Sequence, residues 1–393
     1  MNIRNVIIVI SIVIFVLLAL AVIVLYQYAR SKYGVNLEVD FTKIVAREDY
    51  DVRITEQSEE VTYLTKDSGD NFKILAFTDM HFDGLAKAPM DKTMNEFLNA
   101  MNQEQPDLVI FTGDTVTAIF NKERAKLLAE IMEAYGVYWC AILGNHEGEH
   151  PLSYKREKLI KLWANDIKYP HCLVEPGPED ISGYGNYIVN LLSTNKKIIQ
   201  SLIFMDSGDY VTKEDINTVK YGPGAYDYIK ADQIAWCQEQ IKALPEGTKS
   251  SLFIHIPLNE YAIGWDEIYD EASRTITDTA DCKYVDGFQR EAVCCSEYNS
   301  GLFAVIETLG SMRSVYCGHD HVNDYSIVYK GVKLNYLQAS GYSIYGWNDE
   351  TAAKTEVLEE QSMQGYTILE IDKSGETQIT RIRYKKKGYA DYE

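Results

Sequence analysis

Short apolar segments rich in β-branched residues recur along the chain, and segments of helical period lie between several of them. The predicted strands are Lys73–Phe77, Leu108–Phe111, Tyr138–Leu143, Ser201–Met205, Ser251–Ile254 and Val315–Cys317. The predicted helices are Met90–Met101, Lys122–Tyr135, Tyr154–Trp163 and Asp232–Leu244. Such alternation favours a layered α/β fold. Further strands are predicted at Val332–Leu337, Thr367–Ile371 and Gln378–Arg383.

Five of these apolar segments give way to polar residues whose side chains can bind metal ions. The clusters are Thr78-Asp79-Met80-His81, Gly113-Asp114, Gly144-Asn145-His146-Glu147, His255 and Gly318-His319-Asp320-His321. In open α/β sheets, ligands bind where the strands end and the loops begin. We therefore expect the five clusters to meet at one site.

Each cluster alone is a weak signal, because a single histidine or asparagine after a strand usually makes a hydrogen bond or a turn. Five clusters at strand ends in one chain are harder to dismiss. Of the 7 histidines, only His150 and His171 lie outside them. Imidazole and carboxylate ligands suit Mn, Fe and Zn. The pattern therefore predicts a site for divalent or trivalent metal ions.

The order of the clusters (DxH, GD, GNHE, H and GHDH) resembles the signature of the calcineurin-like metallophosphoesterases. The resemblance implies an α/β fold, a four-layer αββα sandwich of two mixed β-sheets flanked by helices. It implies that one metal ion is bound by Asp79, His81, Asp114 and His321. The second would be bound by Asp114, Asn145, His255 and His319, so that Asp114 bridges the two ions. His146 would stay off the metals, near the leaving group or a phosphoryl oxygen.

A narrower resemblance is to the short, purple-acid-phosphatase-like members of that family. The matching stretches are Ala76–Phe82, Phe204–Tyr210, Tyr226–Gln240, Ile254–Tyr261, Asn299–Gly301 and Tyr316–Tyr325. Purple enzymes carry a metal-bound tyrosine three residues after the aspartate of the GD motif, and Thr117 stands at that position here. We therefore expect neither the purple chromophore nor obligate ferric iron, with His81 in the vacant ligand role.

The resemblance implies a phosphoesterase that hydrolyses phosphate monoesters, phosphoproteins among them. Two metal ions about 3.5–4 Å apart would clamp the phosphoryl group and share a bridging hydroxide. Protonated His146 would assist the leaving oxygen, although the sequence does not identify the partner that orients this ring. Two alternatives stay open: a phosphodiesterase acting on nucleotides, lipid headgroups or envelope polymers, and a catalytically silent binding or sensor domain.

The net charge of the chain is −20. A field of that sign repels the phosphates of nucleic acids, so we expect no nucleic-acid partner. An anionic phosphate-ester substrate would bind only where local cations reverse the potential. The 7 cysteines form no CxxC pair, which argues against a zinc ribbon or a disulfide framework. The sequence does not indicate an oligomeric state.

Residues 6–27, after a short tail at 1–5, predict a single transmembrane anchor. The segment Val6–Tyr26 carries no charged residue, and its 21 positions would span about 31 Å as a helix, enough for a bilayer core. The alternative is a cleaved signal peptide ending near Ala19-Leu20-Ala21, but apolar residues continue beyond that point. We expect a single-pass membrane protein with its catalytic domain outside the cytoplasm, although the flanking charges are nearly balanced.

The remaining boundaries follow from composition. Polar and acidic residues 28–70 predict a stalk, residues 71–385 a metallophosphoesterase domain, and residues 386–393 a polar tail. Residues 264–298 form a polar insertion, interpreted either as a surface loop or as a lid that selects substrates. Candidate substrate contacts in the insertion are Trp265, Tyr269, Asp286 and Arg290.

Overall fold

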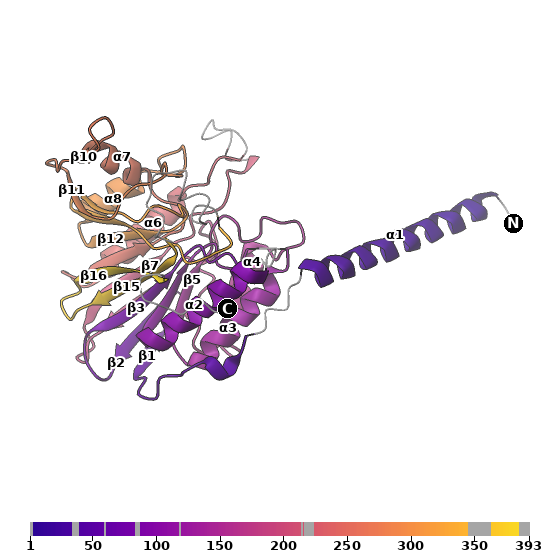
Figure 1. Cartoon of the computed structure of the whole chain (residues 1–393), viewed down its shortest axis with the longest axis horizontal. Coiled ribbons are helices and arrows are strands. Elements are labelled where there is room, and N and C mark those ends of the chain that lie inside the picture. The colour runs from indigo at the N-terminus through magenta and orange to yellow at the C-terminus, as the bar shows by residue number, and fades with distance from the viewer. Residues whose placement is uncertain are drawn as a thin grey trace.

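The computed structural model describes residues 3–33, 39–58, 60–82, 87–117, 119–213, 215, 224–344 and 363–384. At its centre, two β-sheets pack face to face, with helices on both outer faces (Figure 1). The predicted polar tail at 386–393 lies outside the described residues.

The smaller sheet has five strands in the order β16-β15-β3-β4-β5 within the described chain. Its strands are β3 (Phe72–Phe77), β4 (Leu108–Thr112), β5 (Trp139–Ile142), β15 (Gly365–Ile371) and β16 (Thr377–Arg383). Strands β3, β4 and β5 are parallel, whereas β15 and β16 are antiparallel to their neighbours. Helices α2 (Lys87–Glu104), α3 (Asn121–Tyr135) and α4 (Arg156–Trp163) lie on its outer side (Figure 1).

The larger sheet has nine described strands in the order β1-β2-β6-β7-β8-β12-β14-β13-β11. They are β1 (Val52–Gln57), β2 (Val61–Lys66), β6 (Tyr187–Leu192), β7 (Ile198–Phe204), β8 (Lys249–Phe253), β11 (Cys282–Asp286), β12 (Met312–Cys317), β13 (Ser326–Tyr329) and β14 (Val332–Tyr336). The run β7-β8-β12-β14 is parallel. Helices α6 (Ala231–Ala243), α7 (Asn259–Ile268) and α8 (Leu302–Leu309) cover its outer face.

Two apolar cores fill the spaces between these layers. Because successive side chains of a strand point to opposite faces, strands of the larger sheet contribute to both cores. Val189 and Leu202 face the smaller sheet and join the core between the sheets. Their neighbours Ile188 and Ile203 point the other way, into the core beneath α6, α7 and α8. This alternation follows from strand geometry. The predicted α/β fold of mixed sheets and helices is therefore confirmed.

The predicted stalk needs correction, because part of it belongs to the larger sheet. Strands β1 and β2 lie within residues 28–70, and β2 pairs with β6 in parallel. Leu64 of β2 is fully buried. The segment also binds the smaller sheet, since Arg47 and Lys66 both form ion pairs with the buried Asp107, which directly precedes β4. Strand β1 is the edge of the larger sheet, and most of its side chains are at least partly exposed, which explains part of the polar composition that suggested a stalk.

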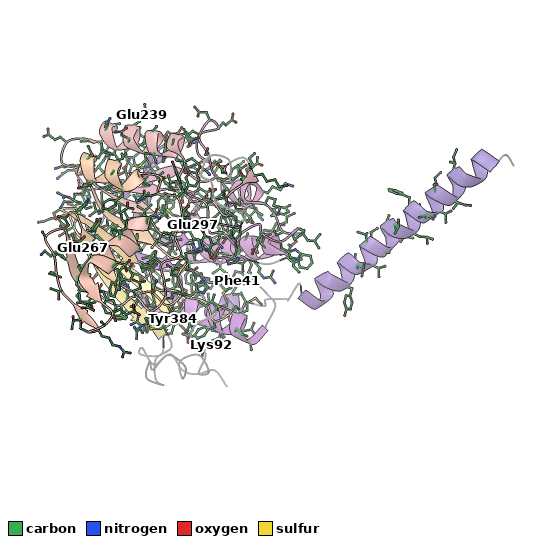
Figure 2. The ribbon with its side chains drawn as sticks, turned by 90° about the horizontal axis from the view of Figure 1, so that it is seen from above. Phe41, Lys92, Glu239, Glu267, Glu297 and Tyr384 are labelled. Carbon is green, nitrogen blue, oxygen red and sulfur yellow. The ribbon has the colours of Figure 1, made fainter. Side chains whose placement is uncertain are left out.

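Helix α1 (Ile3–Tyr33) occupies the region of the predicted anchor and projects away from the sheets (Figure 1). Figure 2 shows its side chains pointing outward along its length, and Phe15, Leu18 and Leu25 are among those exposed. Among the residues described, no helix meets the combined length and apolarity of a membrane span. The anchor at 6–27 therefore stays a prediction without structural support.

The insertion at 264–298 extends the larger sheet. It contains the end of α7, the small β9–β10 hairpin (Tyr269–Asp270 and Thr275–Ile276) and the edge strand β11. All four candidate substrate contacts have structural partners. Trp265 is buried against Tyr325, the Tyr269 ring packs on Trp265, Asp286 pairs with Arg381, and Arg290 pairs with Asp324. These four residues therefore have structural roles within the domain, and the lid interpretation stays a prediction for them.

Candidate metal centre

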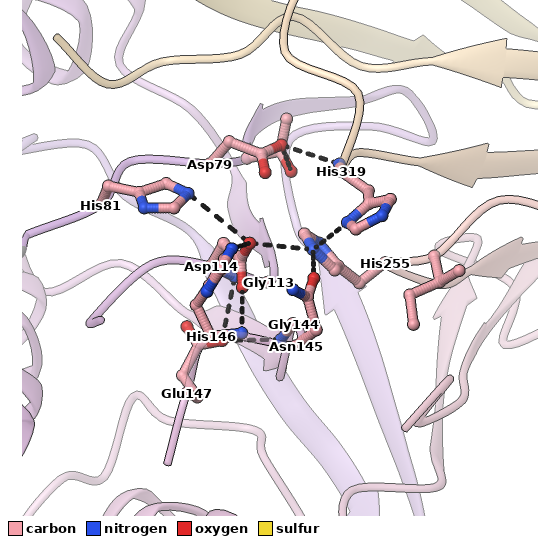
Figure 3. Close-up of polar contacts among 12 residues, drawn as sticks. Asp79, His81, Gly113, Asp114, Gly144, Asn145, His146, Glu147, His255 and His319 are labelled. Carbon is pink, nitrogen blue, oxygen red and sulfur yellow. Dashed lines mark hydrogen bonds and ion pairs between the residues drawn. The ribbon is translucent and has the colours of Figure 1, made fainter. Parts of the chain in front are cut away.

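The five predicted clusters meet where parallel strands of both sheets end. Strands β3, β4 and β5 of the smaller sheet lead into the DxH, GD and GNHE loops. Strands β8 and β12 of the larger sheet lead into the loops of His255 and of GHDH. Figure 3 shows Asp114 in the middle of this group, with His81 on one side and His255 on the other. The structure thus brings together residues up to 242 positions apart in sequence, Asp79 and His321.

One side of the group is formed by Asp79, His81, Asp114 and His321, each of which offers an atom within 4.8 Å of the others. His81 Nε2 lies 3.5 Å from Asp114 Oδ2. His321 Nε2 lies 3.4 Å from Asp79 Oδ1. Two carboxylates and two imidazoles from three loops therefore face a common point.

The other side is formed by Asp114, His255 and His319, with Asn145 next to them. His255 Nε2 lies 3.2 Å from Asp114 Oδ2 and 3.2 Å from Asn145 Oδ1. His319 Nδ1 lies 3.3 Å from the same nitrogen. Because Asp114 belongs to both groups, its carboxylate has the position expected of a bridging ligand.

The orientation of His255 is set from outside the site. Its Nδ1 lies 2.8 Å from the carbonyl oxygen of Thr112. A carbonyl accepts hydrogen bonds and does not donate them, so Nδ1 carries a proton in the neutral ring. The lone pair of Nε2 then points toward Asp114, which is the arrangement that a metal-binding imidazole needs.

Several buried atoms in the site lack hydrogen-bond partners within the described part of the chain. They include Asp79 Oδ1, Asp114 Oδ2 and His81 Nε2. An unsatisfied buried polar group costs about 1–3 kcal/mol, and more when it is charged. A cation bound among these atoms would remove that penalty. The donor set of carboxylate, imidazole and amide oxygen therefore fits two metal ions, although it does not single out Mn, Fe or Zn.

Neighbouring histidines keep the buried carboxylates ionised. Burial favours the neutral form of Asp79, but His321 and His255 outweigh it and lower the pKa of Asp79 to about 2. Burial also opposes ionisation of Asp114, whose pKa His255 and His81 hold well below the usual range. Both groups are therefore anions over the physiological pH range, as metal ligands must be.

The backbone of the site is strained. Asp79, His81, Asp114 and His319 have φ angles of 51°, 44°, 47° and 75°, in a left-handed region that costs about 1–3 kcal/mol for a residue other than glycine. Hydrogen bonds between loops hold this conformation, since Asp79 N donates to Gly113 O at 3.1 Å and His81 N to Asp114 O at 2.9 Å. A Cβ atom on Gly113 would lie 2.5 Å from His255 Nδ1, which explains the glycine of the GD motif.

Glu147 is a structural residue of the site to which the sequence assigned no role. Its fully buried carboxylate accepts hydrogen bonds from four backbone N–H groups. The donors are Gly144 at 2.7 Å, Asp114 at 3.0 Å, Thr115 at 2.5 Å and Val116 at 3.2 Å. Glu147 therefore connects the GD loop to the GNHE loop. The sequence signal that could have identified this role is the position of Glu147 within the GNHE motif.

A second structural link joins the GNHE loop to the larger sheet. The buried guanidinium of Arg156, at the start of α4, donates to the carbonyl of Gly144 and to the carboxylate of Asp206. Next to Asp206, the Ser207 hydroxyl accepts from Ile256 N at 3.0 Å. The stretch Phe204–Tyr210 therefore holds loops of both sheets in place. Its sequence indicated only a resemblance to the purple-acid-phosphatase-like group and gave no role for it.

His146 lies beside the metal-type residues but outside both groups. Its Nε2 is 4.0 Å from Asp114 Oδ2, and its side chain is 37% exposed. On the other edge of the ring, Nδ1 lies 2.7 Å from Glu149 Oε2. Glu149 is thus the partner of His146 that sequence reasoning did not find. Burial disfavours a charged ring, but Asp114 and Glu149 outweigh it and raise the pKa of His146.

Comparisons with known proteins identify the family of this chain. The family model of the calcineurin-like phosphoesterases matches residues 72–323. Probable inactive purple acid phosphatase 29 from Arabidopsis thaliana is 30% identical to this chain, over 70% of the chain and 73% of that protein. Phosphatase DCR2 from Saccharomyces cerevisiae is 28% identical, over 65% of this chain and 45% of that protein.

Among solved structures, a dimetal phosphatase from Danio rerio aligns with 80% of this chain and 99% of its own, at a TM-score of 0.39 and 11% identity. The family model alone spans more than half of the 393 residues. The chain therefore belongs to the calcineurin-like phosphoesterase family, within its purple-acid-phosphatase-like group.

Proposed function

We propose that this chain is a metal-dependent phosphoesterase that hydrolyses phosphate monoesters, phosphoproteins among them. The observation that carries the proposal is the pair of ligand groups that share Asp114. The family supports a dinuclear metal centre, and the six Asp and His residues that match its ligand signature converge, with Asn145 next to them. Some relatives carry the name probable inactive purple acid phosphatase, so the activity of this chain has to be measured. The intact set of ligand-type residues favours an active enzyme.

Two metal ions in this site, when bound, would supply the positive charge that activates a water molecule and neutralises phosphoryl oxygens. The side chains divide the remaining work. Asp79 and Asp114 are buried anions that would hold the cations. His146 has a partly exposed ring next to the site, so it can meet the leaving oxygen of a bound ester and donate a proton to it.

The charge of the chain fits this proposal. A net charge of −20 repels phosphate esters everywhere except where local cations reverse the potential. We infer from the uncharged segment Val6–Tyr26 that the chain is also attached to a membrane by residues 6–27, with the domain outside the cytoplasm. A tethered enzyme would meet substrates at that surface.

A phosphodiesterase is the second candidate, since the same metal centre serves both reactions. The deciding experiment combines elemental analysis of the purified full-length protein with rates on nitrophenyl and alkyl monoesters, a bis-nitrophenyl diester and phosphopeptides. We expect two metal ions per chain and faster monoester hydrolysis. A faster diester rate would replace the proposal with the phosphodiesterase. Two bound metals without any hydrolysis would establish the silent binding domain.

A further inference from the structure

The carboxylate of Glu149 contacts the one histidine of the site that holds no place in either ligand group. We propose that Glu149 is a positioning residue, which holds the His146 ring so that its Nε2 faces the leaving group. This inference rests on the proposed function, because His146 acts on a leaving group only if an ester is hydrolysed. Glu149 itself would not touch the reacting atoms.

The contact has the geometry of a strong hydrogen bond. Nδ1 of His146 and Oε2 of Glu149 are 2.7 Å apart, within one loop and three residues from each other. An ionised carboxylate only accepts hydrogen bonds, so the proton lies on Nδ1. The opposite nitrogen, Nε2, then faces Asp114 across 4.0 Å. One edge of the ring is held while the other is turned to the metal centre.

A second contact fixes Glu149 itself. The hydroxyl of Tyr210 donates to Glu149 Oε1 at 3.3 Å and accepts from Asn145 Nδ2 at 3.2 Å. The ring of Tyr210 is in turn stacked on Tyr226, with centroids 5.9 Å apart and planes 22° from parallel. Hydrogen bonds therefore connect His146, Glu149, Tyr210 and Asn145, so the off-metal histidine is tied to a ligand-type residue.

The simpler alternative is an exposed ion pair without a role, since Glu149 is 50% exposed and such pairs contribute about 0–1 kcal/mol. Three observations favour the positioning role. The carboxylate is bound at both oxygens, it reaches the ring nitrogen remote from the site, and Nδ1 has no other hydrogen-bond partner in the described residues.

This role predicts a specific kinetic signature. General acid catalysis contributes about 10²–10⁴-fold to a rate, and the contribution matters most when the leaving group is a poor one. A nitrophenolate leaves readily without a proton, whereas an alkoxide does not. Loss of the Glu149 contact should therefore slow alkyl esters selectively, while a general structural defect would slow both classes alike.

The test uses the full-length protein with Glu149→Ala, Glu149→Gln, His146→Ala and the double variant His146→Ala/Glu149→Ala. Glu157→Gln, which removes an exposed glutamate charge on α4, is the matched control. We expect the Glu149 variants to keep the wild-type metal content and KM, to lose at least about 10-fold in kcat on alkyl monoesters, and to change little on nitrophenyl phosphate. The double variant should equal His146→Ala, because Glu149 acts through that ring.

A further loss in the double variant, or equal losses on both ester classes, would overturn the positioning role while leaving the phosphoesterase intact. If the wild-type protein hydrolyses no ester, the proposed function fails, and the ¹⁵N NMR signals of His146 decide the contact independently. We expect the signal of an Nδ1–H group hydrogen-bonded to a carboxylate in the wild-type protein, both in the neutral ring and in the imidazolium that donates from Nε2, and its loss in Glu149→Ala. Identical His146 signals in the two proteins would exclude the contact.

Discussion

Asp114 is the residue on which both ligand groups depend. Its Oδ1 accepts from His146 N at 2.9 Å, which leaves Oδ2 free to serve both groups. Its backbone is held in the left-handed region and clamped by Glu147. The shared carboxylate is therefore fixed before any cation binds, so the geometry of two sites is set by one side chain.

Replacing Asp114 with asparagine should remove metal from both groups, because the neutral amide leaves each cation without its shared anion. Elemental analysis should show less than half of the wild-type metal content. Asp166→Asn, an exchange of the same type at an exposed residue, should leave the content unchanged. Equal metal content in wild type and Asp114→Asn would refute the bridging assignment.

Replacing His146 with alanine should spare the metals, since His146 belongs to neither ligand group. Turnover of phosphate monoesters should fall by about 10²–10⁴-fold, the usual contribution of a general acid. His150→Ala, which removes a nearby histidine outside the clusters, serves as the control. Loss of metal in His146→Ala, measured by elemental analysis, would instead make His146 a ligand.

At the scale of elements, the two sheets are joined by side chains as well as by apolar packing. Tyr187 of β6, in the larger sheet, is fully buried against β5 of the smaller sheet. Its hydroxyl donates to Ala141 O at 2.9 Å and accepts from Ala141 N at 3.0 Å. Strand β5 is the edge of its sheet, so this one hydroxyl replaces a missing neighbouring strand at Ala141.

Tyr187→Phe should destabilise the protein by about 1–3 kcal/mol, because the buried N–H and C=O of Ala141 both lose their partner. Denaturant unfolding at constant metal concentration measures the change. Tyr184→Phe removes the hydroxyl of an exposed tyrosine and should change the free energy of unfolding by less than about 0.5 kcal/mol. Equal unfolding free energies for Tyr187→Phe and wild type would show that water or strand movement satisfies Ala141.

Helix α1 stands apart from these layers and exposes apolar side chains along its length (Figure 2). If residues 6–27 anchor the chain as proposed, deleting residues 1–33 should move the protein from the membrane fraction to the soluble fraction after cell lysis, because the apolar segment that would insert into lipid is removed. Ester hydrolysis per metal-loaded chain should stay unchanged, since no site residue lies in α1. Recovery of the full-length chain in the soluble fraction would contradict membrane attachment.

At the scale of the whole molecule, the site is a junction between the two sheets. Asp79, His81 and Asp114 come from loops of the smaller sheet, whereas His255, His319 and His321 come from the larger one. The N–H of His319 already crosses the junction to donate to Asp79 Oδ2 at 3.0 Å. Metal ions bound here would cross-link the two sheets.

Removing metal with a chelator should therefore lower the thermal midpoint of the domain. A ligand present at 100 times its dissociation constant stabilises the folded state by about 2.7 kcal/mol. Scanning calorimetry with and without chelator measures the shift, and metal added back should reverse it. Asp114→Asn should show a low midpoint that the chelator does not change. A wild-type midpoint unaffected by chelator would contradict the cross-link.

Much of the architecture and of the site follows from local patterns in the chain. The period of apolar residues located β3, β4, β5, β8 and β12, because a buried strand needs apolar side chains wherever it lies. The residue types at their ends located Asp79, Asp114 and His255, because metal chemistry selects carboxylate and imidazole. Both signals are carried by a few neighbouring residues, so no knowledge of distant contacts is needed to read them.

Other features depend on contacts between distant segments, which local patterns do not contain. The pairing of β2 with β6 turned polar residues assigned to a stalk into part of a sheet. Side chains of the insertion have partners elsewhere in the chain, such as Tyr325 and Asp324, that their own sequence did not indicate. The contact of Glu149 with His146 requires a particular conformation of the GNHE loop. The hydrogen bonds of Glu147 to the distant GD loop help to impose that conformation. Strand ends and residue chemistry are thus local properties, whereas the partner of each side chain is settled when the two sheets pack.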